Sequence, residues 1–187
     1  MKEKMLIDLD DTIIVDSWKE LTEEYLKKTI DLDSLKPGTY VNSGLISPEF
    51  TKYFLEHNLY DYGKLDSYVV DSIKELSKRY DVYISSIFVT PGMPEISSIF
   101  AKRKIDFLNE YFPFLGEDKF LILGSKNMIE VDISIGDSMS DQIGKKQNFL
   151  LTRYHNMHIS KEEISKKNSI RVNSWKELME YFDKNNF

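Results

Sequence analysis

The sequence contains no cysteine, which excludes disulfide bonds and any metal site built on thiolates. It also has no apolar run long enough to cross a membrane or to act as a signal segment. It has no basic excess either, because 25 Lys and Arg face 31 Asp and Glu, for a net charge of −6. A general binder of nucleic acid polymers normally carries such an excess, whereas a small nucleotide is still compatible. We therefore expect a cytoplasmic protein that binds neither a membrane nor a nucleic acid polymer.

The 187 residues, 41% of them hydrophobic, are enough for one substantial core with a small appended lobe. Short apolar segments alternate with helix-like segments, a pattern typical of a parallel sheet in an α/β protein. The expected strands are 4–9, 81–86, 119–123, 132–135 and 148–151, and the segment 170–177 is expected to hold a last short strand and a capped helix. This order predicts an α/β fold with a Rossmann-like, doubly wound parallel sheet.

The stretch between the first two expected strands has the signals of a small helical lobe. Ser17-Trp18-Lys19-Glu20 has the spacing of a capping box before a helix that runs to about Thr29. Ser47-Pro48-Glu49 offers an N-cap followed by proline at the first helical position, and residues 33–38 form a turn between the two helices. We expect a catalytic core of residues 1–15 and 67–187, with a cap of residues 16–66 inserted after the first strand.

Two carboxylates stand where the first expected strand ends, within Met5–Thr12. Side chains two residues apart in extended backbone point the same way, so Asp8 and Asp10 can share a cation unless the loop turns Asp10 elsewhere. A cation reduces the cost of crowding acids together. It leaves one oxygen free to attack phosphorus while a neighbouring carboxyl transfers the leaving group's proton. The alternative is an ordinary surface turn, because Asp and Thr are common turn residues.

A second apolar run, Ile133–Ile135, ends in Gly136-Asp137 and is followed by Asp141. Ligands of open α/β sheets bind beyond the carboxyl ends of the strands, so the two acidic strand ends can converge on one site. Gly136 allows a close backbone approach, and Asp137 supplies a further oxygen ligand for Mg²⁺. The structural alternative is that Asp137 or Ser138 only caps a helix that begins near Asp141.

These two acidic motifs resemble DxDx[TV] and GDxxxD of the haloacid dehalogenase superfamily of phosphotransferases. The resemblance implies an aspartyl-phosphate mechanism in which Asp8 is the nucleophile and Asp10 is the general acid and base. It also implies a Mg²⁺ ion held by Asp8, Asp10 and Asp137, with Asp10 contributing its backbone carbonyl.

A serine or threonine at a strand end is the superfamily's next motif, and Asp81–Ser86 offers two serines. We favour Ser86, which is expected at the strand tip, where its hydroxyl and the following amide of Ile87 can hold a phosphoryl oxygen. Ser85 is expected to point to the other side of the sheet and is a substrate-binding candidate together with Ile87. Adjacent serines after a strand also commonly satisfy loop backbone, which is the structural alternative.

Two lysines compete for the superfamily's phosphate-neutralising position. Lys104 lies in a helical stretch, 101–113, and Lys126 follows the third expected strand. The segment Lys104–Phe112 resembles the K-x-x-W-[VL]-x-x-[YH]-[FL] helix of the 5′(3′)-deoxyribonucleotidase family, with Phe107 in place of Trp. On that resemblance we assign the catalytic role to Lys104 and a phosphate or substrate contact to Lys126.

Further similarities to this family follow in the same order along the chain, at 58–60, 122–126 and 150–156, so that the match covers about residues 6 to 156. The chain departs from the family at Asp11-Thr12, at Gly136 and at Ser86-Ile87-Phe88, where the family has Gly-Val, a first Asp, and Thr-Ser-Pro or similar. The resemblance therefore speaks more strongly for phosphatase chemistry than for nucleotide specificity.

We predict a Mg²⁺-dependent phosphatase that acts on nucleoside or deoxynucleoside 5′-monophosphates. A phosphatase for another small phosphomonoester and a noncatalytic phospholigand-binding regulatory module are the alternatives. A homodimer is compatible with the resemblance. Substrate choice is expected in the cap, where Trp18 is the first candidate for stacking on a base, although aromatics at helical spacing are more often core. The histidines His155 and His158 give no clear metal pattern, because a third ligand is missing.

Overall fold

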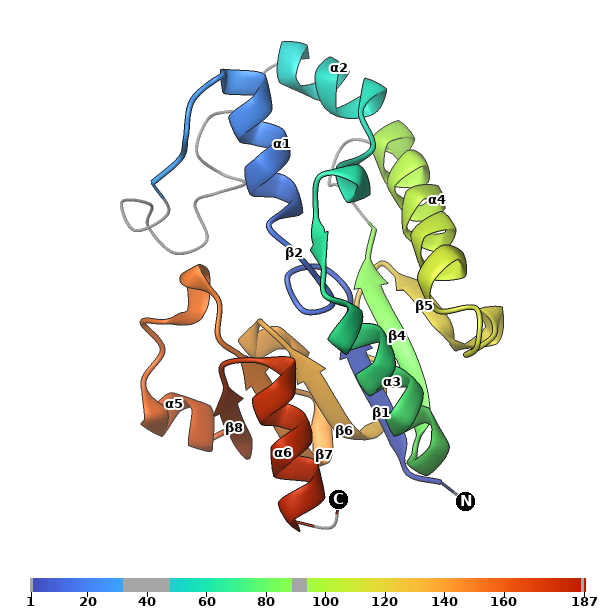
Figure 1. The fold of residues 1–187 in the computed structure, drawn as a ribbon, viewed down its shortest axis with the longest axis vertical. Helices are drawn as coiled ribbons and strands as arrows, with labels where there is room; N and C mark the ends of the chain where they lie inside the picture. The colour runs from blue at the N-terminus through green and yellow to red at the C-terminus, as the bar shows by residue number, and fades with distance from the viewer. Residues whose placement is uncertain (1, 32–47, 89–93, 186) are drawn as a thin grey trace.

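The computed structural model describes residues 2–31, 48–88, 94–185 and 187. Six parallel strands form one sheet in the order β5-β4-β1-β6-β7-β8 (Figure 1). Their bounds are β1 Lys4–Asp8, β4 Asp81–Ile87, β5 Phe120–Leu123, β6 Val131–Gly136, β7 Gly144–Leu151 and β8 Ser169–Val172. The chain adds strands outward from β1 first on one side and then on the other. The predicted doubly wound α/β fold is confirmed, and its topological switch point lies beside β1.

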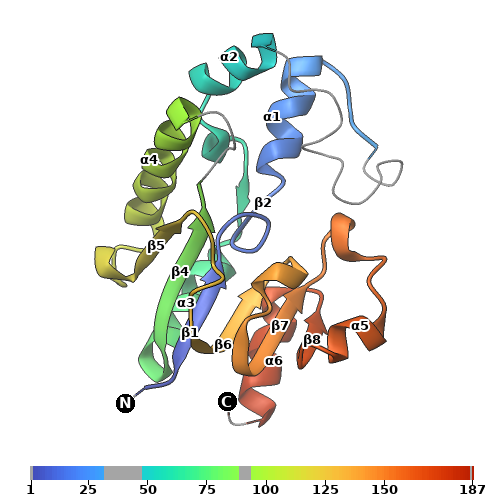
Figure 2. The ribbon, with the colours of Figure 1, turned by 180° about the vertical axis from the view of Figure 1, so that it is seen from behind.

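One face of the sheet is covered by helices α3 (Ser67–Arg79) and α6 (Trp175–Asn185), which contact each other. They lie in front of the sheet in Figure 1 and behind it in the reverse view of Figure 2. Asp66 caps α3 by accepting a hydrogen bond of 2.9 Å from the backbone N–H of Tyr68. Alternate strand residues and one face of each helix meet in the main core, which includes Ile7, Ile135, Phe149, Ile73, Leu76, Leu178 and Phe182.

Helix α4 (Pro94–Tyr111) connects β4 to β5 and contributes Phe107 and Leu108 to the same core. The remaining short elements are η3 (Glu117–Lys119), η4 (Met139–Asp141), η5 (Tyr154–Asn156) and α5 (Lys161–Ser165). Among the helices of the described residues, none is both long and apolar enough to cross a membrane.

The described residues between β1 and α3 lie beyond the carboxyl ends of the strands (Figure 1). It contains β2 (Ile14–Val15) paired with β3 (Lys64–Leu65), the helices α1 (Ser17–Leu26) and α2 (Pro48–Glu56), and the 3₁₀ turn η2 (Leu59–Asp61). These elements share a second buried apolar cluster of Leu21, Phe50, Phe54 and Leu59, joined by Phe100 of α4. The expected turn at 33–38 and the expected N-cap Ser47 lie outside the described residues. The division into core and cap stays a prediction.

Several element boundaries differ from the sequence-based expectation. Helix α1 ends at Leu26 instead of about Thr29, because Lys27 adopts a left-handed conformation (φ 52°) that ends the helix. Its N-cap is Asp16 and not Ser17, so the expected capping box does not form. Strand β7 begins at Gly144, four residues earlier than expected, because parallel pairing with β6 extends it through polar residues that carry no apolar signal.

Candidate active site

The ends of β1, β4 and β6 place candidate residues together at the carboxyl edge of the sheet. Asp8 is the last residue of β1 and pairs in register with Ser85 of β4. Asp137 follows the last residue of β6. The backbone N–H of Leu9 donates to the carbonyl oxygen of Ser85 at 3.1 Å, which fixes the start of the acidic loop against β4. The two acidic strand ends therefore converge at one edge of the sheet, as expected for a topological switch point.

Three carboxylates form a buried acidic cluster, defined here as Asp8, Asp137 and Asp141. One oxygen of each lies within 4.8 Å of the others, and the three residues are 7 to 8% exposed. Burial, followed by the charge of Asp141, raises the pKa of Asp8 well above its ordinary value, and burial also raises that of Asp141. Hard oxygen donors crowded in this way suit a small divalent cation such as Mg²⁺.

Lys126 provides positive charge to this cluster. Its ammonium contacts Asp8 and donates a hydrogen bond of 2.7 Å to Asp141, while the side chain is only 6% exposed. The paired carboxylates raise the pKa of Lys126 in spite of its burial. Lys126 thus pairs with two of the three carboxylates of the cluster, so the lysine charge alone does not balance their negative charge.

Asp141 is held in this place by the short turn η4. Ser138 caps the turn, and the Asp141 carboxylate accepts from the backbone N–H of Ser138 at 3.3 Å. A β-carbon added at Gly136 would lie 2.5 Å from that of Asp141, so only glycine lets the two segments pack. The capping role considered from the sequence and the clustering of the acids are therefore both present in one loop.

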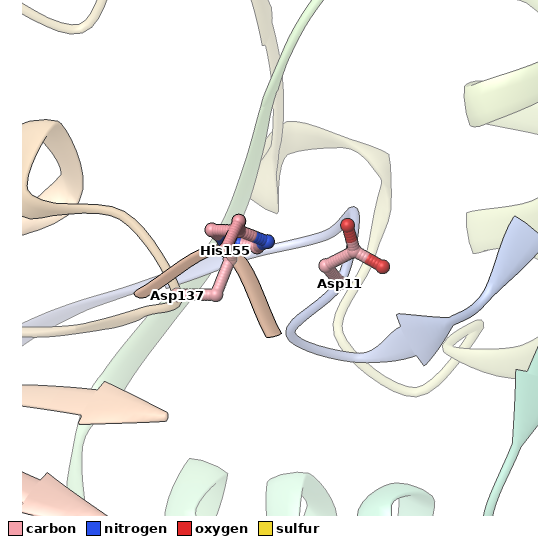
Figure 3. Close-up of side chains that lie close together, drawn as sticks. All are labelled: Asp11, Asp137 and His155. Carbon is pink, nitrogen blue, oxygen red and sulfur yellow. The ribbon is translucent and has the colours of Figure 1, made fainter. Parts of the chain in front are cut away.

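Asp137 is fixed by residues from two other loops. Thr12 donates to one of its carboxylate oxygens at 2.9 Å, and His155 Nε2 lies 2.7 Å from the other. Figure 3 shows Asp137 and His155 close together with Asp11 beside them, and these three also lie close enough to hold a metal ion. Burial raises the pKa of Asp11 to about 6, helped by the charge of Asp137. Burial alone would lower the pKa of His155, but the hydrogen bond and charge of Asp137 outweigh burial and raise this pKa above its ordinary value.

The sequence interpretation gave His155 no role. The sequence feature that could have identified His155 is its position soon after β7, at the same sheet edge as the acids. Loops that follow strand ends at this edge commonly contribute residues to a site. Neighbouring Asn156 anchors the same loop by donating 2.7 Å hydrogen bonds to the carbonyl oxygens of Asp137 and Leu151.

Asp10 lies in a separate group of donors on the α4 side. Its carboxylate accepts from Lys104 at 2.5 Å, from Ser86 at 2.6 Å and from Tyr60 at 2.8 Å. Lys104 is fully buried and also donates to Ser86 at 2.7 Å. Burial alone would raise the pKa of Asp10, but the charge and hydrogen bond of Lys104, with the other two donors, lower it below its ordinary value.

The backbone explains why Asp8 and Asp10 face different partners. The strand ends at Asp8, and the next residues form a tight loop in which the N–H of Ile13 donates to the carbonyl oxygen of Leu9 at 2.9 Å and Asp11 has a φ of 54°. The alternation of side-chain direction along the strand therefore stops at Asp8. The carboxylate of Asp10 is not part of the acidic cluster, and a contribution of Asp10 to the metal would come from its backbone.

The two lysines are also divided between the two acids. Lys126 contacts Asp8, the expected nucleophile, whereas Lys104, our sequence-based choice for the catalytic lysine, contacts Asp10. The helical resemblance identified Lys104 as a residue of the site, but only the packed structure shows which carboxylate each lysine reaches.

The two serines of β4 lie on opposite faces of the strand. Ser86 is part of the Asp10 group, and β4 continues to Ile87, so Ser86 is not at the strand tip as expected. Ser85 is fully buried beside Asp8, and its hydroxyl has no hydrogen-bond partner among the described residues. Such an orphaned hydroxyl is costly in a folded protein unless a ligand satisfies it.

The other expected substrate residues lie at the border of the site. Ile87 is 45% exposed at the end of β4. Trp18 of α1 is partly buried and stacks on Phe54 with ring centroids 5.0 Å apart. One face of the indole is therefore already occupied by the second apolar cluster.

Comparisons with known proteins agree over almost the whole chain. A family described as "5' nucleotidase, deoxy (Pyrimidine), cytosolic type C protein" matches residues 3–184. A "putative 5'(3')-deoxyribonucleotidase" of Staphylococcus aureus is 28% identical over 189 residues, covering 97% of this chain and 96% of the relative. The 5'(3')-deoxyribonucleotidase of Bacillus subtilis is 32% identical over 108 residues, covering 56% of this chain and 54% of the relative.

A solved structure of similar fold comes from Bacteroides fragilis and is described as a "putative haloacid dehalogenase-like hydrolase". It superposes with a TM-score of 0.52 at 14% identity, covering 92% of this chain and 96% of that chain. At this level of identity the likeness supports the arrangement of sheet and helices.

Proposed function

Because this chain belongs to the cytosolic type C 5′-nucleotidase family of the haloacid dehalogenase superfamily and is a phosphatase, we propose that it hydrolyses nucleoside or deoxynucleoside 5′-monophosphates through a phosphorylated Asp8. The observation that supports this proposal is that two neighbouring carboxylates, those of Asp8 and Asp10, have different partners. Asp8 lies in the acidic cluster, whose carboxylates suit a cation, and Asp10 lies in a separate group where Lys104 and Tyr60 donate hydrogen bonds to it.

The proposed reaction has two steps. A carboxylate oxygen of Asp8 attacks phosphorus and forms an aspartyl phosphate, while the bond from phosphorus to the ester oxygen breaks and that oxygen takes a proton from Asp10, which enters this step in its protonated form. Water then attacks the same phosphorus and gives a proton to Asp10. The bond to Asp8 breaks, which releases inorganic phosphate and restores both side chains.

The acidic cluster is the proposed Mg²⁺ site. The residues that would hold the ion are Asp8 and Asp137, with the backbone carbonyl of Asp10. The donor set fits, because these ligands are all oxygens and the cluster has more carboxylates than positive charges. A bound Mg²⁺ would neutralise the negative charge that develops on the phosphoryl oxygens. Asp141 would position Lys126 beside Asp8.

Phosphate binding is proposed for groups around Asp8 and Asp10. The buried Ser85 hydroxyl has no partner and lies beside Asp8, so a phosphoryl oxygen would satisfy it. Lys126 is proposed as the cation next to the attacked phosphorus because it contacts Asp8. Ser86 and Lys104 are proposed to act through Asp10, and Ile87 through its backbone amide.

The nucleotide is the proposed substrate because the relatives that match along the chain are named for deoxyribonucleotides. We also propose that residues 16–66 form the cap that recognises the nucleoside, since their helices lie beyond the carboxyl ends of the strands. Trp18 is the proposed base contact, through the ring face that Phe54 leaves free. A homodimer and a cytoplasmic location are parts of the same proposal.

Phosphate release from a panel of ribonucleotides, deoxyribonucleotides and sugar phosphates, with and without Mg²⁺, tests the proposal. Native protein should hydrolyse deoxynucleoside or nucleoside 5′-monophosphates fastest, and Asp8→Asn should lose at least about 1,000-fold in rate. Preferred turnover of a sugar phosphate would favour the alternative of another small phosphomonoester. Full activity of Asp8→Asn would contradict the aspartyl-phosphate mechanism.

Thermal unfolding supplies a readout of the metal that does not depend on activity. Mg²⁺ binds the folded protein only, so at about 100 times its Kd it should add about 2.7 kcal/mol of stability. Asp137→Asn should abolish that gain, whereas Asp10→Asn, which keeps the backbone carbonyl, should retain it. Equal gains in the native protein and in Asp137→Asn would place the ion elsewhere.

A further inference from the structure

Tyr60 brings a phenol hydroxyl to the carboxylate of Asp10 from a distant part of the chain. The residue belongs to η2, fifty positions after Asp10, and its hydroxyl donates to Asp10 Oδ1 at 2.8 Å. The side chain of Tyr60 is buried, with 6% of the residue exposed, whereas that of Asp10 is 31% exposed. A substrate can therefore reach Asp10 while Tyr60 stays behind it.

The tyrosine is held on several sides. Its backbone N–H donates to Asn58 at 3.3 Å, and its ring stacks on Phe107 of α4 with centroids 5.0 Å apart. The Lys104 ammonium lies 5.8 Å from the centre of the same ring. The hydroxyl is thus a fixed donor, because the ring that carries it has little freedom to turn.

The hydrogen bonds that the Asp10 carboxylate already accepts determine which of its lone pairs stays available. A carboxylate offers about four acceptor positions, two on each oxygen. Lys104 and Ser86 both donate to Oδ2, and Tyr60 donates to Oδ1. A single position is left on Oδ1, and its direction is set by the bond from Tyr60.

We propose that Tyr60 is a positioning residue that orients Asp10 so that the remaining lone pair of Oδ1 faces the oxygen of the leaving group. This inference rests on the proposed function, because it assigns Asp10 the transfer of the proton. When the ester bond breaks, the electron pair passes to the ester oxygen and the proton on Oδ1 follows it. Water later returns a proton to the same oxygen.

Substrates with different leaving groups can show whether Tyr60 orients Asp10 or only packs beside it. An alkoxide leaving from a nucleotide needs a well-placed proton, whereas p-nitrophenolate leaves readily without one. The parameter kcat/KM includes only the steps up to departure of the leaving group, so hydrolysis of the aspartyl phosphate does not affect the comparison.

The experiment compares kcat/KM of native protein and Tyr60→Phe on a deoxynucleoside 5′-monophosphate and on p-nitrophenyl phosphate. We expect a loss of about tenfold on the nucleotide and less than about twofold on p-nitrophenyl phosphate. Phenylalanine keeps the ring stacked on Phe107, so Tyr60→Phe should fold. A melting curve checks that it does. Equal losses on both substrates, or no loss on either, would overturn the proposal.

Two control variants sharpen the test. Tyr83→Phe removes a similar bond, in which the Tyr83 hydroxyl donates to Asp81 at 3.0 Å at the other end of β4, and it should change neither rate. Phe107→Leu loosens the packing under Tyr60 but keeps its hydroxyl, so its loss on the nucleotide should be smaller than that of Tyr60→Phe. If native protein hydrolyses neither substrate, the proposed function fails and the role of Tyr60 fails with it. If native protein is active and Tyr60→Phe has native rates on both substrates, the role of Tyr60 alone fails.

Discussion

The two lysine–aspartate pairs at the end of β1 have different charge balances. Lys126 is shared between Asp8 and Asp141, and Asp137 completes an acidic cluster that pairs with no second lysine in the part of the chain that the structure describes. Lys104 serves Asp10 alone among the carboxylates, with neutral hydroxyl groups completing the set. One pair belongs to a group with excess negative charge, and the other belongs to a group in which positive and negative charges match.

This difference moves the two pKa values in opposite directions. Burial and the neighbouring Asp141 raise the pKa of Asp8, while Lys104, Ser86 and Tyr60 outweigh burial and lower that of Asp10. Two carboxylates only two residues apart in sequence can therefore take different roles because the loop delivers them to different partners. A cation is expected to bind where charge is missing, and proton transfer is expected where donors already define one orientation.

Removal of each lysine in turn gives the largest expected contrast. Lys126→Met leaves buried carboxylates without their cation, so without divalent metal it should cost about 3–5 kcal/mol in the free energy of unfolding. Lys104→Met should cost about 1–3 kcal/mol, because Asp10 is partly exposed and keeps two neutral donors. Chemical denaturation of both variants, in chelator and in Mg²⁺, measures these losses.

Magnesium makes the contrast sharper. The ion should recover part of the stability of Lys126→Met, because it supplies charge to the acidic cluster, and should give Lys104→Met only the gain seen for native protein. Equal losses in chelator, or equal rescue of the two variants, would show that the two groups do not differ in charge balance.

The two serines of β4 test the same division with a smaller effect. Ser86→Ala removes a donor to Asp10 and an acceptor for Lys104, so it should cost about 1 kcal/mol of stability. Ser85→Ala removes a hydroxyl that has no partner, so stability should stay the same or rise, while phosphatase activity should fall. Unfolding curves and initial rates of both variants provide the measurements. A Ser85→Ala protein that is less stable than Ser86→Ala would contradict the account.

Sequence patterns predicted the parts of the molecule that depend on local order. The alternation of apolar and helical segments predicted the parallel sheet, and the acidic ends of its first and fourth expected strands predicted that Asp8 and Asp137 lie together. Periodicity could not predict that Lys126 reaches Asp8 while Lys104 reaches Asp10, because each contact depends on how a loop or helix packs.

The contacts that the sequence did not reveal come from residues with ordinary local roles. Tyr60 is one of several aromatic residues between β1 and α3, and only packing against α4 brings its hydroxyl to Asp10. His155 lies in a short turn without a metal-binding pattern, yet that turn brings it to Asp137. Ser85 was predicted to bind substrate and to point away from Ser86, but its place beside Asp8, its partner in the sheet register, could not be predicted without the strand pairing.

A third lysine–aspartate pair, at the amino end of β4, provides a reference for both pairs of the site, because the Lys119 side chain is 23% exposed whereas those of Lys104 and Lys126 are 0% and 6% exposed. Lys119 donates to Asp81 at 2.7 Å, and the Asp81 side chain is 34% exposed. The hydrogen bond from Lys119 holds the pKa of Asp81 below its ordinary value, with a smaller contribution from Tyr83. Because the folded pKa lies below the unfolded one, the pair adds stability above about pH 4 and loses it as pH falls through the folded pKa.

Asp81→Asn should therefore cost no more than about 1 kcal/mol at neutral pH, and the difference from native protein should shrink on acidification. Denaturation at neutral pH and at about pH 3 checks this expectation. A difference that grows on acidification, or one as large as that of Lys126→Met, would remove the distinction between exposed and buried pairs on which the comparison depends.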